Sequence, residues 1–197
     1  MTIKQGIIGA LFWGMLAQPI SAKLIFEWRD TSVPEQERGK IEQRLQRVAL
    51  KYTEQKYADL GAYNFITAEE RYVIQIGNEA PFLAGHSAAR RTVILRQCFP
   101  CPQLDIVFFH ELDHAYAYAM GDIRLRFSVK NPSVFNWYLT ESRALQKEYL
   151  YIDEIQNVIP KKYYQKFQEC KENDISETYR KRGILMKEWI KEYSSSK

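Results

Sequence analysis

Two of the chain's three histidines lie four residues apart, with a glutamate directly after the first. The segment His110-Glu111-Leu112-Asp113-His114 fits the pattern H-E-x-x-H. Because residues i and i+4 share one face of an α-helix, both imidazoles can bind a single metal ion if the segment is helical. Glu111 then lies beside that ion, where its carboxylate can accept a proton from water that the metal activates. The segment therefore predicts a zinc site with His110 and His114 as ligands and Glu111 as the catalytic base.

A helix over residues 103–120 is expected to carry this segment. Pro102 suits the first turn of a helix, and Gly121 marks its end. Four apolar side chains recur at helical spacing on the side away from the histidines: Phe108, Leu112, Ala115 and Ala119. The pattern predicts one face that packs into the core and one face that carries the chemistry.

The rest of the chain predicts a small sheet followed by helices. Strands are expected at 24–28, 71–76 and 92–96, with a loop over 78–87, and helices at 34–57, 133–158, 161–172 and 176–193. Residues 124–129 fit either a short strand or a loop. This order predicts an α+β fold in one domain over residues 23–197, with a short mixed sheet packed on the helix of the histidines and a helical C-terminal part.

The segment Ile106–Tyr116 resembles the active-site helix of the zincin metallopeptidases. A metzincin would have Gly and His where this chain has Ala117 and Met120, so that branch is excluded. The resemblance to the gluzincin branch implies a small zincin-like domain whose third zinc ligand is a glutamate on a later helix. It also implies that the strand before the active-site helix, residues 92–96, lines the cleft and pairs with an extended substrate.

Glu141 is the preferred third ligand. It lies in Thr140-Glu-Ser-Arg-Ala144, which resembles the third-ligand segment of several gluzincin families. A carboxylate on an apolar helix face is costly unless it is paired or binds metal. The apolar residues that share a helix face with Glu141 are Ala144, Leu145, Ile152 and Ile155. Two alternatives stay open: Asp122 as the ligand, or Glu148, either as a ligand or as a partner that orients a histidine.

The resemblance implies peptide hydrolysis. Three protein ligands leave one position of zinc for water, whose pKa the metal lowers to about 7. Glu111 is expected to take the proton from this water and return it to the leaving amine. Tyr138, one turn before Glu141, is the candidate hydrogen-bond donor to the developing oxyanion. The predicted protein is a zinc-dependent endopeptidase that acts on a protein or peptide substrate.

The N-terminal residues have the layout of a secretory signal peptide. Lys4 supplies positive charge, residues 6–17 form an uncharged apolar run, and cleavage is expected after Ala22. The run is shorter than the roughly 20 apolar residues that a membrane-spanning helix needs, so stable membrane insertion is not expected after cleavage. Residues 1–22 are thus predicted to be a cleaved signal peptide, and the mature protein to be periplasmic or secreted.

The three cysteines allow one disulfide bond in an oxidising compartment. Cys98 and Cys101 are expected to form a structural disulfide, either with each other or through one of them with Cys170. The same pair leaves a less favoured alternative, a thiol–disulfide redox protein. A second alternative is a non-catalytic module in which zinc supports a binding groove, although a structural zinc site has no need of the carboxylate of Glu111.

The composition is that of a globular protein. Hydrophobic residues make up 46% of the chain and charged residues 26%, which excludes an intrinsically disordered chain. The formal net charge of +4 is mild and the basic residues form no dense run, so no nucleic-acid partner is expected. No pattern in the sequence indicates an oligomeric state.

Overall fold

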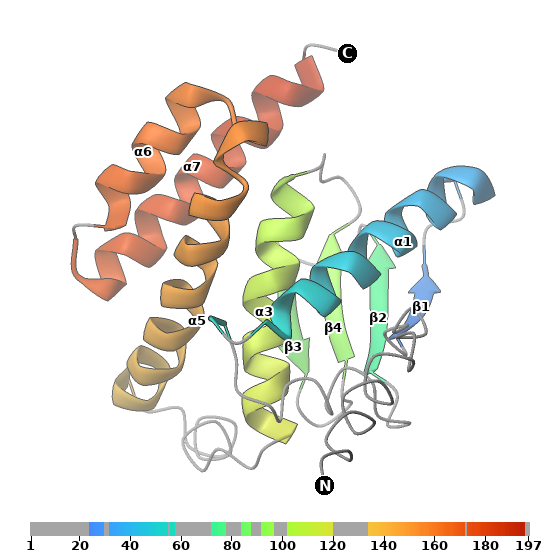
Figure 1. Ribbon diagram of the computed structural model, residues 1–197, viewed down its shortest axis with the longest axis horizontal. Helices are drawn as coiled ribbons and strands as arrows, with labels where there is room; N and C mark the ends of the chain where they lie inside the picture. Colours follow the sequence, from blue (N-terminus) through green and yellow to red (C-terminus); the bar gives the residue numbers. More distant parts are fainter. Residues whose placement is uncertain are drawn as a thin grey trace, which may run out of the picture.

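The computed structural model describes residues 24–29, 32–54, 56–57, 72–77, 84–87, 92–96, 102–119, 134–171 and 173–195. Over these residues the chain has an α+β fold that is mostly helical, with five α-helices and one four-stranded sheet (Figure 1). This confirms the predicted α+β class with a short mixed sheet and a helical C-terminal part. The predicted signal peptide over 1–22, the cysteines Cys98 and Cys101, residues 124–129 and Asp122 lie outside the described residues.

The sheet is mixed, and its strands follow the order β1-β2-β4-β3. Strands β1 (Leu24–Trp28), β2 (Tyr72–Gly77) and β4 (Thr92–Arg96) run parallel, and β3 (Ala84–Ser87) pairs antiparallel with β4. Val93 and Leu95 of β4 are two residues apart, so they share one face of the sheet, and both are buried. This face belongs to the core.

Strand β3 corrects the prediction that residues 78–87 form a loop. Its sequence, Ala-Gly-His-Ser, has no run of β-branched or aromatic side chains, so it carries no strand signal of its own. The strand forms through backbone pairing with β4, with Ala84 opposite Leu95 and Ser87 opposite Thr92.

This pairing also overturns the predicted role of residues 92–96. Strand β4 has β2 on one side and β3 on the other, which leaves it no free edge for a substrate. The prediction that residues 92–96 pair with an extended substrate is therefore wrong. In the described sheet the edge strand on this side is β3.

The helices lie where the sequence predicts them. They are α1 (Glu35–Tyr52), α3 (Gln103–Ala119), α5 (Val134–Glu154), α6 (Lys161–Lys171) and α7 (Ile175–Ser195). The helix predicted over 133–158 ends at Glu154, and a short 3₁₀ helix, η2 (Gln156–Val158), follows it. Helices α6 and α7 form an antiparallel hairpin that packs on α5 through α7 (Figure 1). None of the described helices has the length and apolar character needed to cross a membrane.

Helix α3 lies at the centre of the molecule, where it packs against α1, α5 and the β4 and β3 strands (Figure 1). Every side chain from Gln103 to Ala117 is buried. The helix therefore lacks the open chemical face that its apolar stripe predicted, and Ala119, the last residue of that stripe, is exposed. Charged side chains on a helix enclosed on all sides are costly unless each has a partner.

Candidate metal centre

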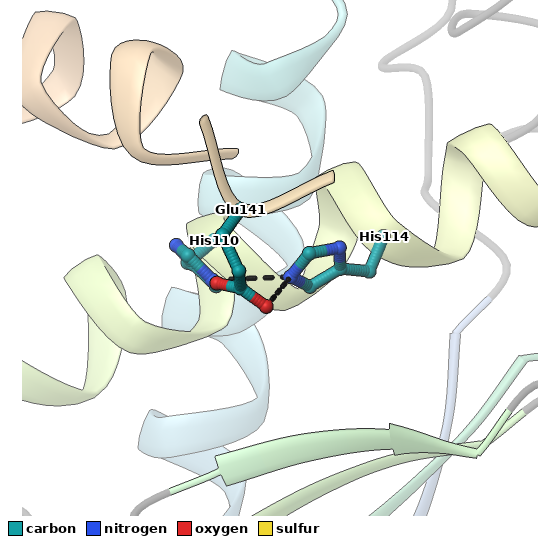
Figure 2. Close-up of side chains that lie close together, drawn as sticks. All are labelled: His110, His114 and Glu141. Atoms are coloured by element: carbon teal, nitrogen blue, oxygen red, sulfur yellow. Dashed lines mark hydrogen bonds and ion pairs between the residues drawn. The ribbon is translucent and has the colours of Figure 1, made fainter. Parts of the chain in front are cut away.

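Three side chains from two helices meet beside α3. His110 and His114 project from one face of α3, and Glu141 reaches them from α5 (Figure 2). The two Nε2 atoms lie 3.1 Å apart, Glu141 Oε2 lies 3.2 Å from His110 Nε2, and Glu141 Oε1 lies 3.3 Å from His114 Nε2. All three residues are at most 8% exposed. The structure thus brings together the three predicted ligands, in an arrangement that could hold a metal ion.

The donor atoms of this centre fit a small tetrahedral ion. A tetrahedral zinc site with metal–donor bonds of about 2.0–2.1 Å places its donors about 3.3 Å apart. The observed separations of 3.1, 3.2 and 3.3 Å are close to that spacing, with each carboxylate oxygen of Glu141 facing a different histidine. Two imidazole nitrogens and one carboxylate form a donor set typical of catalytic zinc, which keeps a further position open.

The electrostatics of the centre favour positive charge. Burial raises the pKa of Glu141, but hydrogen bonds with His110 and His114 outweigh burial and hold this pKa well below its usual range. Burial lowers the pKa of His110, but the carboxylates of Glu141 and Glu148 overcome it and raise this pKa to about 10. The carboxylates of Glu141 and Glu148 thus make this buried centre favourable for a cation, and a metal ion that binds there displaces the proton from Nε2 of His110.

Glu111 lies next to His110 on α3 and is 8% exposed. Burial raises the pKa of its carboxyl group, and the charges of His114 and His110 oppose that rise. A carboxylate whose pKa lies above its usual range is a better proton acceptor near neutral pH than an ordinary glutamate. Its environment therefore suits the base that the sequence predicts at this position.

Glu148 is not one of the three candidate ligands. It contacts the ring of His110 on the side away from Glu141. Its Oε2 is 2.9 Å from His110 Nδ1, the ring nitrogen that faces away from Glu141. Its Oε1 accepts a hydrogen bond of 2.5 Å from Arg182 Nε on α7. Of the two roles left open for Glu148, the structure therefore gives it the second, a partner that orients a histidine.

The sequence analysis missed Arg182, although its spacing carries a signal. Arg182 recurs at helical spacing with buried residues of α7, namely Thr178, Leu185, Met186 and Trp189. A charged residue within such a buried stripe needs a partner of opposite charge. The partner could not be read from the sequence, because Glu148 lies on another helix.

A second buried ion cluster joins α3 to α5. The carboxylate of Asp113 is fully buried and accepts hydrogen bonds from Tyr52 on α1 at 2.7 Å, Arg143 at 2.7 Å and Lys147 at 2.6 Å. Burial raises the pKa of Asp113, but Arg143 and Lys147 outweigh burial and hold it below its usual range. This cluster fixes the position of α5 against α3.

The side chain of Tyr138 is 39% exposed, and none of the described interactions joins it to His110, His114 or Glu141. Its role as donor to the oxyanion stays a prediction. Tyr179 on α7 interacts electrostatically with the carboxylates of the centre. Burial raises the pKa of Tyr179, and the negative charges of Glu141 and Glu111 raise it further. Tyr179 is 38% exposed, so its side chain is accessible to solvent.

Cys170 on α6 is a buried free thiol. The structure therefore does not contain the predicted alternative in which Cys170 pairs with Cys98 or Cys101. A bond between Cys98 and Cys101 concerns residues outside the described ranges.

Comparison with known proteins gives no relative. No protein-family model, curated protein or solved structure matches the chain.

Proposed function

We propose that this protein is an exported zinc-dependent endopeptidase. One observation carries the proposal: His110, His114 and Glu141 bring their donor atoms together, and the buried Glu111 interacts electrostatically with all three. These residues come from helices far apart in sequence, so the convergence is a property of the fold and not of the H-E-x-x-H pattern alone. Zinc bound there supplies a Lewis acid that polarises a carbonyl group and activates water.

The residues of the chain then have separate tasks. Glu111 accepts a proton from the attacking water and returns it to the leaving amine, which its raised pKa favours. Glu148 orients the ring of His110 and keeps the proton of that ring on Nδ1, so that Nε2 is available as a donor. Burial of the centre excludes bulk water and strengthens these interactions.

The sheet suggests where an extended substrate binds. β3 is one of the two edge strands of the described sheet, and α3 packs against it. An edge strand offers unpaired backbone groups to a peptide that adds as a further strand. In this proposal the substrate pairs with β3, in place of the interior strand β4, and its scissile bond lies over the histidines.

The experiment compares the zinc-loaded full chain with its Glu111→Gln variant on a complex peptide library, with cleavage sites read by mass spectrometry. The variant removes the base but keeps both imidazoles, so zinc content is expected to persist while the rate falls by at least ~100-fold. Glu169→Gln, on the exposed surface of α6, serves as the matched control and should retain full activity.

Two other outcomes would count against the proposed endopeptidase activity. Cleavage by Glu111→Gln at the wild-type rate contradicts the proposed mechanism. A wild-type chain that binds zinc through His110 but cleaves nothing supports the non-catalytic zinc module instead.

A further inference from the structure

A network of three buried residues connects the last described helix to the metal centre. Arg182 on α7 donates to Glu148 on α5, and Glu148 faces His110 on α3. None of the three is more than 6% exposed. We call these residues the Arg182–Glu148–His110 network. It reaches the ring nitrogen of His110 on the side away from the candidate metal position.

The atoms without hydrogen-bond partners point to the same network. Among the described residues, the buried side-chain atoms left unsatisfied include His110 Nδ1, Glu148 Oε2 and Arg182 Nη2. All three belong to this network, and the first two are only 2.9 Å apart. A metal on Nε2 forces the ring proton onto Nδ1, where it can be donated to Glu148 Oε2. The 2.9 Å pairing of these two atoms is therefore the arrangement that a metal-bound His110 needs.

Charge balance explains why an arginine is needed. The centre contains three buried carboxylates, Glu111, Glu141 and Glu148, and one buried guanidinium, Arg182. Arg182 is the guanidinium that pairs with Glu148, and without it the buried carboxylate of Glu148 would keep only His110 as a described ionic partner. A buried carboxylate that loses a charged partner is costly, so Arg182 favours the observed position of Glu148.

We propose that Arg182 is a positioning residue of the metal centre: its hydrogen bond holds Glu148 in place, and Glu148 in turn holds His110 in the orientation that binds metal. The inference rests on the proposed function only in assuming that His110 binds a metal. In this proposal α7 supplies a residue to the metal centre in addition to packing on α5.

The test measures the zinc affinity of the full chain by competition with a chromogenic chelator, with no assay of activity. Arg182→Gln should weaken zinc binding by about 10–100-fold, the usual effect of losing a group that supports a metal ligand. Arg182→Lys keeps the charge but not the planar fork, so it should weaken zinc binding by a smaller factor. Met186→Ala removes a fully buried side chain from the same helix and is the matched control, which should lower the melting temperature and leave zinc affinity unchanged.

A double variant separates action through Glu148 from general damage. If Arg182 acts through Glu148, then Arg182→Gln should cost no further affinity in a Glu148→Gln background, because the interaction is already lost. Wild-type affinity in Arg182→Gln, or additive losses in the double variant, would overturn the proposal. If Arg182→Gln does not fold, Arg182→Lys is compared in the same two backgrounds, and no loss or an additive loss overturns the proposal again. A wild-type chain without His110-dependent zinc binding would instead contradict the proposed function itself.

Discussion

The ion pair between Asp113 and Arg143, at 2.7 Å, joins the two helices that supply the candidate ligands. Asp113 precedes His114 on α3, and Arg143 follows Glu141 by two residues on α5. The pair therefore fixes the register in which Glu141 faces the histidines. Lys147, one turn after Arg143, binds the other oxygen of the same carboxylate and strengthens this constraint.

Asp113→Asn should lower both stability and zinc affinity. The fully buried carboxylate holds two cations and a tyrosine hydroxyl, and its loss leaves partly buried donors without an anionic acceptor. We expect the free energy of unfolding to fall by roughly 2–3 kcal/mol, which urea denaturation of the zinc-free chain would measure. Glu192→Gln, which removes an exposed ion pair with Lys162, should change it far less. Equal effects of the two substitutions would show that the Asp113 cluster does not hold the helices together.

Replacement of each candidate third ligand by alanine should single out Glu141. Glu141→Ala is expected to lose zinc on dialysis against a weak chelator to the same extent as His110→Ala, because each removes one of three donors. Glu148→Ala should retain weakened binding, and Asp122→Ala should bind as the wild type does. Zinc loss confined to Asp122→Ala would contradict the gluzincin-type assignment and leave α5 with a packing role.

Tyrosine substitutions should identify the donor to the oxyanion, given the proposed peptidase activity. Tyr179→Phe removes a hydroxyl in the field of Glu141 and Glu111, and we expect kcat to fall on the order of 100-fold with zinc content unchanged. Tyr138→Phe, at a similarly exposed tyrosine without a described contact to the centre, is the matched control and should keep kcat. A loss of kcat confined to Tyr138→Phe would identify Tyr138, the residue that the sequence suggested, as the donor.

Glu154 should contribute a pH-dependent part of stability. Burial raises its pKa, but hydrogen bonds from Lys51, Lys56 and Tyr57 outweigh burial and lower the pKa from 4.5 to about 2. Because the folded-state pKa lies below the unfolded one, the stabilisation is fully present above pH 4.5 and is lost as pH falls toward about 2. Glu154→Gln should therefore reduce the difference in unfolding free energy between about pH 6 and about pH 3, as measured by urea denaturation. An unchanged difference would show that this carboxylate is not coupled to folding.

The sequence could predict the parts of the centre that depend on one helix at a time. His110 and His114 are brought together by the pitch of α3, and Glu141 stood out as a charge on an apolar stripe of α5. Arg182 and the position of Glu148 depend on how α7 packs on α5, which no local pattern records. Strand β3 was missed for the same reason, since its residues form a strand only where β4 supplies backbone partners.

Helix α3, enclosed along Gln103–Ala117, also determines how the centre can move. Amide groups of a helix packed on every side exchange with solvent hydrogen only when the whole domain opens, whereas exposed edges exchange through local fluctuations. The scaffold of both histidines should therefore belong to the slowest-exchanging part of the protein. Any adjustment that admits a ligand must then come from the elements around α3, while the two imidazoles stay in place.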